Sequence, residues 1–275
     1  MGRILERQME ERYPDRVVSA TREEMDLTDP ARLVLEMERL DPPPTVTVNC
    51  AALTDPALAE TSPEACLASN REGVAALSRA CREIRCRLIH LSTVDVFDGR
   101  KPAPYLESDP ADSTSRYGRI RHLGELEAAG GNPDHLVLRL SLVCGGGGAG
   151  DPLVEITGAL EEGRSLPWDE RRVSPIFPED LGSAVTTVLK NDWRGVLHVA
   201  DGGSCLLSEL AAETARLLGA PAAPELAGGR GPASFWEKGG PNAALDTGRF
   251  VSLSGRRLRD WRAALAASLG ARGEE

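Results

Sequence analysis

The feature that most constrains this fold is a regular alternation of short apolar segments with longer helical segments. Runs rich in apolar and β-branched residues occur at 17–20, 45–51, 87–92, 135–140 and 195–200. Helical periodicity fills 3–12, 30–40, 63–84, 113–129, 151–162, 179–190 and 207–218. Short apolar strands joined by helical crossovers are typical of parallel sheets that are buried on both faces. The sequence therefore predicts an α/β fold with a Rossmann-like, doubly wound parallel sheet.

A glycine run, GGGGAG at 145–150, interrupts this alternation. Such a run predicts a loop above the carboxyl ends of the strands, where ligands bind in folds of this class. We therefore predict a main domain over 1–150 and a smaller lobe over 151–275 that is interleaved with the sheet. A connector rich in Gly, Pro and Ala at 219–234 leads to the last segment of the chain.

The composition argues against several classes of function. The formal net charge of −10 argues against nucleic-acid binding, which relies on clustered Lys and Arg. No apolar run reaches the roughly eighteen residues of a membrane span, and the charged start has no apolar signal segment, so we expect a cytoplasmic protein. The six cysteines and four histidines lack metal-site spacing, which predicts reduced thiols and no metal. The oligomeric state stays open, with a homodimer among the alternatives.

Four residues form a pattern that suits proton transfer. Ser92 and Thr93 lie at the end of a predicted strand, and Tyr117 and Arg121 are four residues apart on one face of a predicted helix. A fixed positive charge beside a phenol stabilises its anion and lowers its pKa. A hydroxyl from Ser92 or Thr93 could hold a substrate carbonyl while Tyr117 donates a proton to it. Taken alone, a Tyr and an Arg at this spacing more often have a structural role.

Other polar and aromatic residues have simpler interpretations. We expect His122 to be a surface helix residue. Asp95 and Asp98 are expected to fix the loop after the strand through side-chain hydrogen bonds to the backbone. The four tryptophans are expected to pack in the core, with ligand contact as an alternative for Trp236.

Several stretches follow one another in an order that is specific to one family. They are VNCAALTD at 48–55, LSTVDVFDG at 91–99, YLESDPADSTSRYGRIRHLGE at 105–125, LRLSLVCG at 138–145 and RRVSPIFPEDLGSAV at 171–185. With them the chain resembles the extended short-chain dehydrogenase/reductase superfamily over nearly its whole length. The matching branch is that of dTDP-4-dehydrorhamnose reductase and the methionine adenosyltransferase beta subunit. The resemblance implies a Rossmann-like fold, an NADP or NAD cofactor and a nucleotide-sugar substrate.

The resemblance also implies roles for individual residues. Thr93 matches the hydroxyl that binds the substrate carbonyl, Tyr117 matches the proton donor, and Arg121 stands where the family has a lysine that holds the nicotinamide ribose. The implied cofactor-binding residues are Gly2, Asp26, Leu27, Ala51, Ala52 and Leu142, together with Tyr117 and Arg121. The implied substrate-binding residues are Thr93, Arg172 and Pro175.

Three positions depart from the family pattern. Gly2 matches the last glycine of a GxxGxxG loop, so the rest of this loop and the first strand of the sheet are expected upstream of Met1. Arg121 keeps the positive charge of the family's lysine but not its compact ammonium group. The family's STDYVFDG is STVDVFDG here, which places the acid at Asp95. We therefore expect the chain as given, with its first strand missing, to bind NADPH weakly or not at all.

Two functions follow as hypotheses. The first is NAD(P)H-dependent reduction of a 4-keto nucleotide-linked deoxysugar, with Tyr117 as the proton donor. The alternative is a non-catalytic nucleotide-binding or regulatory subunit of the same fold, which the absent glycine loop and the change at Arg121 favour. A start codon upstream of Met1 would supply the loop and strengthen the enzymatic hypothesis. The sequence does not specify the sugar, the nucleotide, or NADH against NADPH.

Overall fold

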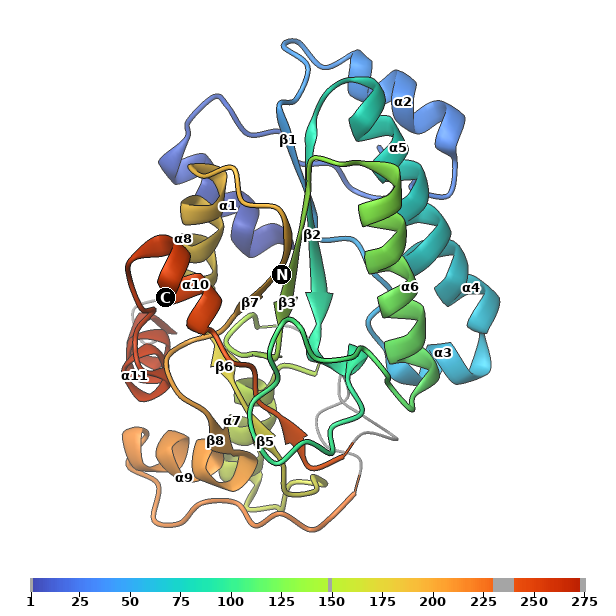
Figure 1. Cartoon of the computed structure of the whole chain (residues 1–275). Coiled ribbons are helices and arrows are strands. Elements are labelled where there is room, and N and C mark those ends of the chain that lie inside the picture. The colour runs from blue at the N-terminus through green and yellow to red at the C-terminus, as the bar shows by residue number, and fades with distance from the viewer. Residues whose placement is uncertain (1, 148–149, 230–239, 273–275) are drawn as a thin grey trace.

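A four-stranded parallel sheet forms the centre of the protein (Figure 1). The computed structural model describes residues 2–147, 150–229 and 240–272. The sheet consists of β1 (Val46–Asn49), β2 (Arg87–Thr93), β3 (His135–Leu140) and β7 (Gly195–Val199), in the order β1-β2-β3-β7. Each neighbouring pair of strands is parallel, which confirms the predicted α/β class.

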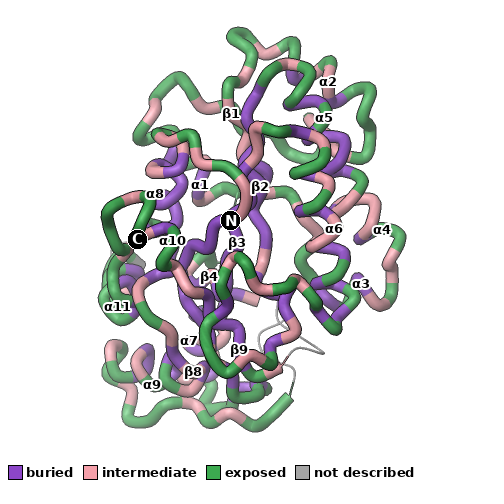
Figure 2. The backbone as a smooth tube through the Cα atoms, in the orientation of Figure 1, coloured by how far each residue is buried: buried purple, intermediate pink, exposed green. Residues whose placement is uncertain are grey.

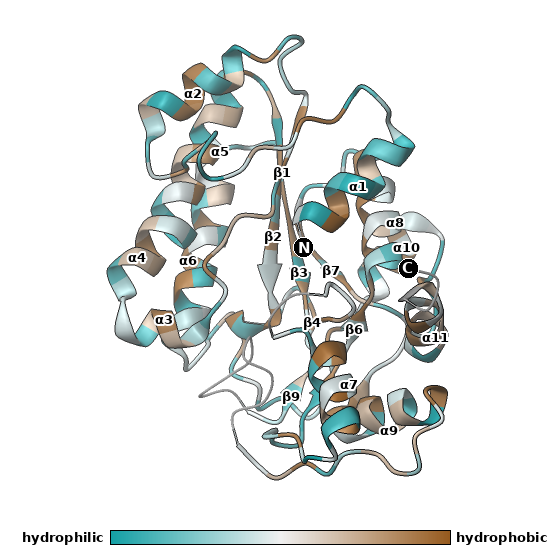
Figure 3. Ribbon diagram, turned by 180° about the vertical axis from the view of Figure 1, so that it is seen from behind, coloured by the Kyte–Doolittle hydropathy of each residue, from teal (hydrophilic) through white to brown (hydrophobic). Residues whose placement is uncertain are grey.

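Helices cover the sheet on both faces (Figure 1, Figure 3). One layer contains α2 (Pro30–Glu38), α5 (Gly73–Glu83) and α6 (Arg116–Gly131), and the other contains α1 (Gly2–Arg12), α8 (Pro178–Leu189) and α10 (Gly248–Ser254). Figure 2 shows the strands buried between the two layers. On β3 this double cover buries consecutive apolar residues, Leu136, Val137 and Leu138, because neighbouring side chains on a strand point to opposite faces.

The predicted helix at 63–84 is interrupted by a π-helical turn. It consists of α4 (Pro63–Leu67), the π-turn η1 (Ala68–Glu72) and α5. The turn points the buried side chain of Asn70 at the loop after β1, where it bonds the N–H and the carbonyl of Leu53 at 2.9 and 2.8 Å. Turns of this kind often occur near functional sites. The short helix α3 (Pro56–Thr61), which precedes α4, is not indicated by the periodicity.

The predicted strand at 17–20 is wrong. These residues belong to no strand and form no ladder hydrogen bonds within the described ranges, and Val18 is 68% exposed. A short apolar segment becomes a strand only where a neighbouring strand satisfies its backbone groups. β1 forms one edge of the described sheet and β7 the other, and the first three residues of β1 are only half-buried.

A smaller lobe lies at the lower end of the sheet in Figure 1. It contains α7 (Pro152–Glu162), α9 (Leu207–Leu217) and a three-stranded sheet of β8 (Cys205–Leu206), β5 (Arg172–Val173) and β9 (Asn242–Ala243). Two further strands, β4 (Leu142–Val143) and β6 (Pro175–Ile176), pair with each other, and α11 (Trp261–Arg272) contacts β6 and α9. Since β7 and α8 follow α7 in the chain yet belong to the main layers, the two parts are interleaved. The division at residue 150 stays a prediction.

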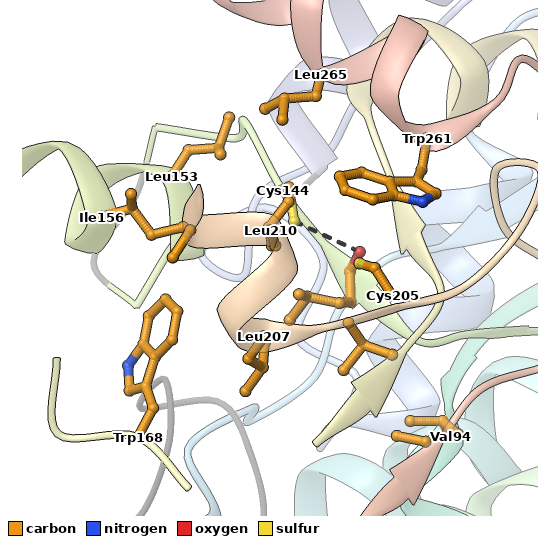
Figure 4. Close-up of a cluster of buried hydrophobic side chains, with 14 of the residues drawn as sticks. Val94, Cys144, Leu153, Ile156, Trp168, Cys205, Leu207, Leu210, Trp261 and Leu265 are labelled. Atoms are coloured by element: carbon orange, nitrogen blue, oxygen red, sulfur yellow. Dashed lines mark hydrogen bonds between the residues drawn. The ribbon is translucent and has the colours of Figure 1, made fainter. Parts of the chain in front are cut away.

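An apolar core holds the smaller lobe together (Figure 4). Trp168 and Trp261 are fully buried in it beside Leu210 of α9. Trp193 packs instead against the edge of the Phe250 ring in the main domain. The packing role predicted for these three tryptophans is confirmed, and Trp236 lies outside the described residues.

The described ranges contain no helix with both the length and the apolar character that a bilayer crossing requires. Within the same ranges, the His, Cys, Asp and Glu side chains form no group of three that could hold a metal ion. No disulfide joins cysteines in this part of the chain.

Candidate active site

The first turns of α6 are held against the end of β2 by a close backbone contact. Ser115 caps the helix, because its side chain accepts a hydrogen bond from the N–H of Gly118 at 2.9 Å. A Cβ atom on Gly118 would lie 1.9 Å from the carbonyl oxygen of Asp95, so this approach requires glycine. The helix is thereby fixed beside the short turn η2 (Val94–Val96) that follows β2.

Tyr117 lies in the first turn of α6 and is only 5% exposed. Its ring packs in a small apolar cluster with Ala59 and Cys66. Burial raises the pKa of Tyr117 to about 12, against the opposing charge of Arg121 and with a smaller contribution from Asp95. Arg121 does lower the pKa of Tyr117, as the sequence predicts. The predicted net decrease is wrong, because desolvation of the phenolate raises the pKa by more than Arg121 lowers it.

Arg121 lies one turn further along α6 and is 4% exposed. Its Nη2 donates a hydrogen bond to the carbonyl oxygen of Leu91 in β2 at 2.5 Å. Its Nε and Nη1 are buried and have no partner among the described residues. The guanidinium stabilises the ionised forms of both Tyr117 and Asp95, so it lies close to each of them.

Thr93 ends β2, and its hydroxyl is bonded to Asp95. It donates to Asp95 Oδ2 at 2.7 Å and accepts from the Asp95 N–H at 3.2 Å. Burial raises the pKa of Asp95 to about 7, although the hydrogen bond from Thr93 and the charge of Arg121 oppose this rise. The predicted loop-fixing role is wrong for the Asp95 carboxylate, which bonds a side chain. It is confirmed for Asp98, whose carboxylate accepts from the N–H of Arg100 at 3.0 Å.

Ser92 belongs to a buried ion-pair network outside the proton-transfer group. Its hydroxyl donates to Glu125 at 2.6 Å, and Glu125 also accepts two bonds from Arg139 at 2.9 and 2.7 Å. His122 joins the same carboxylate from the helix surface at 3.2 Å. Of the two hydroxyls considered from the sequence, Thr93 is therefore the one that lies beside the predicted catalytic pair.

Gly2 and the loop after β1 lie together at the carboxyl end of the sheet. A Cβ atom on Gly2 would lie 3.6 Å from Cβ of Cys50. The Ala51 N–H donates to the Asn49 side chain at 3.0 Å, and the π-turn holds the rest of the loop. Ala51 is exposed and Ala52 is half-buried. Three predicted cofactor-binding residues thus come together in one region.

Asp26 and Leu27 lie beside the start of α5. Cβ of Leu27 is 2.9 Å from the position that a Cβ on Gly73 would take. The Asp26 carboxylate accepts from the N–H and the hydroxyl of Thr28 at 2.9 and 2.8 Å. Leu27 also lines a surface groove of about 330 Å³ formed with η1, α5 and α6. None of the three predicted catalytic residues lines this groove.

The remaining predicted contacts lie on β4, β5 and β6. Leu142 and Pro175 are partners in the β4–β6 pairing, and both are buried. Leu142 has no exposed surface, and Arg172 on β5 is half-buried. The structure thus brings Leu142 and Pro175 together, while the binding roles of all three residues stay predictions.

Comparison with known proteins gives consistent matches. Residues 1–272 match the family model of the RmlD substrate binding domain. The chain is 32% identical over 265 residues to the dTDP-4-dehydrorhamnose reductase of Mycobacterium tuberculosis (strain ATCC 25618 / H37Rv), which covers 93% of this chain and 84% of that protein. It is 34% identical over 209 residues to the dTDP-4-keto-6-deoxy-D-glucose reductase of Streptomyces niveus, covering 74% and 70%.

Solved structures share the fold. The dTDP-4-dehydrorhamnose reductase from Bacillus anthracis str. Ames, solved in complex with NADP, aligns with a TM-score of 0.87 at 18% identity, covering 98% of this chain and 93% of that one. A hypothetical dTDP-4-dehydrorhamnose reductase from Sulfolobus tokodaii aligns with a TM-score of 0.77 at 26% identity, covering 90% of each chain. The chain therefore belongs to the RmlD substrate binding domain family, together with the dTDP-4-dehydrorhamnose reductases.

Proposed function

We propose that this protein is an NAD(P)H-dependent reductase of a 4-keto nucleotide-linked deoxysugar. The observation that carries the proposal is the placement of Tyr117 and Arg121 on one buried side of α6, next to the end of β2 where Thr93 lies. Two relatives are named as reductases of dTDP-linked keto sugars, which supports this substrate class. A structural neighbour solved with NADP supports the cofactor.

In this proposal Tyr117 donates a proton to the substrate carbonyl oxygen as negative charge develops there. A phenol whose pKa is about 12 is protonated at neutral pH and is still more acidic than an alcohol, so it can neutralise the developing alkoxide. The buried charge of Arg121 stabilises the phenolate that remains. The Thr93 hydroxyl orients the carbonyl by a hydrogen bond. NADPH or NADH, when bound, supplies the hydride.

The residues at the predicted cofactor site fit a dinucleotide. The first turn of α1 begins at Gly2, and the free N–H groups of a helix N-terminus favour phosphate. The adjoining loop carries only small side chains at Ala51 and Ala52. Arg121 keeps two buried donor nitrogens without a partner among the described residues, and ribose hydroxyls could satisfy them. The further cofactor contacts that we propose are made by Asp26, Leu27 and Leu142.

We propose that the smaller lobe binds the nucleotide-sugar. Arg172 is a half-buried cation on β5, which suits a pyrophosphate group, and Pro175 begins β6 close to it in sequence. The net charge of −10 supports a small anionic ligand held by specific cations and not a nucleic acid. A cytoplasmic location fits this class of substrate.

One observation favours the second hypothesis, a non-catalytic nucleotide-binding or regulatory subunit. The Nη2 atom of Arg121 is bonded to the Leu91 carbonyl, so part of the guanidinium is tied to the sheet. A lysine ammonium at this position would not be held by that bond, so it would be freer than this guanidinium to reach a ribose. A subunit of this kind would bind NADPH and a sugar nucleotide without oxidising the cofactor.

Separate measurements of binding and turnover test both hypotheses. The protein is titrated with NADPH by fluorescence and then mixed with dTDP-4-keto-6-deoxy sugars while the cofactor absorbance is followed. A reductase oxidises NADPH only in the presence of the keto sugar, and Tyr117→Phe lowers that rate by about 10²–10⁴-fold while NADPH still binds. Tyr13→Phe, at a tyrosine that lies outside the site, serves as the control and keeps the rate.

The two remaining outcomes are equally clear. Binding of both ligands without oxidation supports the non-catalytic subunit. An unchanged rate in Tyr117→Phe removes Tyr117 from the mechanism and with it the observation that carries the proposal.

A further inference from the structure

Asp95 forms a closed pair of hydrogen bonds with Thr93. The Thr93 hydroxyl donates to Asp95 Oδ2 at 2.7 Å, and the Thr93 oxygen accepts from the Asp95 N–H at 3.2 Å. A hydroxyl has one hydrogen to donate. While Asp95 is ionised, this hydrogen is therefore directed at the carboxylate and not at a ligand.

Asp95 is enclosed among charged and polar groups from α6 and from the segment before β5. It is 4% exposed, and its Oδ1 has no hydrogen-bond partner among the described residues. The guanidinium groups of Arg121 on α6 and of Arg171 before β5 lower the pKa of Asp95. The charge of Asp95 in turn raises the pKa of Tyr117 on α6. A carboxyl group in this setting is poised between its two protonation states, because burial favours the neutral form and the two cations favour the ionised form.

Protonation of Asp95 would reverse the direction of the hydrogen bond to Thr93. A neutral carboxyl group has an O–H that can donate to the Thr93 oxygen, which has a second lone pair for it. The Thr93 hydrogen is then free to point at a substrate carbonyl. The carboxylate forms one O–H bond with a proton taken up from solvent, and apart from that only these hydrogen bonds change.

We propose that Asp95 is a positioning residue that controls the Thr93 hydroxyl: the neutral carboxyl group releases this hydroxyl to bind the carbonyl of the substrate, and the carboxylate withdraws it. The proposal rests on the proposed reductase function, since it assigns Thr93 to the carbonyl. The acid that carries it stands where the family pattern STDYVFDG given above has Tyr.

Titration of Asp95 tests the coupling without substrate or cofactor. Protein labelled with ¹³C at the aspartate carboxyl carbon is titrated by NMR, and the Asp95 signal is assigned by its loss in Asp95→Asn. Its midpoint is expected near neutral pH, since burial raises the pKa of Asp95 to about 7. In Thr93→Val the midpoint rises further, because the carboxylate loses its donor. A midpoint near the ordinary value of roughly 4, or one that Thr93→Val leaves unchanged, overturns the coupling.

The pH dependence of reduction tests the consequence for catalysis. In the wild type, kcat falls by up to about tenfold per pH unit above the Asp95 midpoint, because the ionised form withdraws Thr93. Asp95→Asn keeps an amide that can donate to the Thr93 oxygen at every pH, so its kcat stays level over the same interval. Asp98→Asn, a nearby carboxylate with its own partners, retains the wild-type fall.

These results separate the inference from the function on which it rests. If no keto sugar is reduced while the NMR midpoints behave as expected, the reductase function fails and the Asp95–Thr93 coupling stands. If the wild type is active and Asp95→Asn still loses activity above neutral pH, the function stands and control by Asp95 is overturned. Circular dichroism of each variant shows whether it is folded.

Discussion

The Glu125 carboxylate on α6 accepts two hydrogen bonds from the Arg139 guanidinium on β3, at 2.9 and 2.7 Å, although the two side chains are only 4% and 5% exposed. This pair joins the helix that carries Tyr117 to the strand that follows it in the chain. The geometry of the candidate site therefore depends on a charge pair in the core.

Removing one member of this pair should be strongly destabilising. In Glu125→Ala the Arg139 charge stays buried without its partner, which costs about 3–5 kcal/mol in the free energy of unfolding. Urea unfolding of Glu125→Ala, Arg139→Leu and the double variant measures the coupling. The double variant is expected to be more stable than the sum of the single losses predicts, and strict additivity would contradict the pairing. Glu213→Ala, which breaks an exposed pair with Arg216, should change stability little.

The same carboxylate should make stability depend on acid pH. Burial opposes ionisation of Glu125, but the hydrogen bonds from Arg139 and His122 outweigh it and lower its pKa to about 2. Because the folded pKa lies below the unfolded one, this stabilisation is complete above about pH 4.5 and is lost as the pH falls toward 2. It amounts to about 3 kcal/mol. Urea unfolding between pH 2 and 5 should show this slope in the wild type and a weaker one in Glu125→Gln. Equal slopes would refute the assignment.

Gly118 should be irreplaceable for a steric reason. In Gly118→Ala the new Cβ would meet the Asp95 carbonyl oxygen at 1.9 Å, and a backbone atom cannot turn aside as a side chain can. Displacement of α6 costs about 1–3 kcal/mol and moves Tyr117 relative to Thr93. Gly130→Ala is the matched control on the same helix, since no heavy atom lies within 4 Å of its added Cβ. It should be neutral or stabilise by up to about 1 kcal/mol. Thermal unfolding distinguishes the two variants. A Gly118→Ala variant with the melting temperature of the wild type would contradict the close contact with the Asp95 carbonyl oxygen.

Much of this architecture can be predicted from the sequence, because short parallel strands and their crossover helices leave a periodic signal. Strand 135–140 is observed with the predicted limits, and the predicted neighbours Tyr117 and Arg121 do lie on one buried side of a helix. The segment at 17–20 has the composition of a strand but no partner within the described chain. Composition cannot reveal whether a neighbouring strand is present.

The properties of the site that depend on burial could not be predicted in this way. The sequence gives the charge of Arg121 but not the burial of Tyr117, and burial decides the direction of the phenol's net pKa shift. The partner of Ser92 is 33 residues away on another element, so no local pattern signals it. The substitution at Asp95 is visible in the sequence, but only the enclosed position of its carboxylate gives it a role beyond the loop.

Two substitutions at Arg121 separate the effect of its positive charge from the effect of its hydrogen bond to the Leu91 carbonyl. In Arg121→Met the phenolate of Tyr117 loses its nearby cation, so the reduction rate should fall by about 10–100-fold and the alkaline limb of the pH profile should move upward. Arg121→Lys keeps the charge and loses the bond to the Leu91 carbonyl, so it should retain most of the rate with a stability loss of about 1–3 kcal/mol. Equal activity losses in both variants would indicate a purely structural role.

Asp201 should be a source of instability at neutral pH. Burial and the facing carboxylate of Asp180 raise the pKa of Asp201, so its carboxyl group holds a proton in the folded state that it releases in the unfolded state. The contribution of Asp201 to the free energy of unfolding is therefore fully present only below the pKa of about 4 that an aspartate has in the unfolded chain. This contribution declines as the pH rises toward the pKa of Asp201 in the folded protein. Asp201→Asn keeps an oxygen that can accept the Phe177 N–H, now bonded at 3.2 Å, and removes this proton uptake.

The Asp201→Asn variant should thus unfold at a higher temperature than the wild type at pH 7, and the difference should shrink toward pH 4. Asp180→Asn is the matched control, because Asp180 accepts bonds from Arg259 at 2.8 and 2.7 Å and its loss should lower stability at pH 7. Calorimetry over this pH range measures both effects. A lower melting temperature for Asp201→Asn at pH 7 would mean that the Asp201 carboxyl group is ionised in the folded protein, with Arg259 as the cation that compensates it.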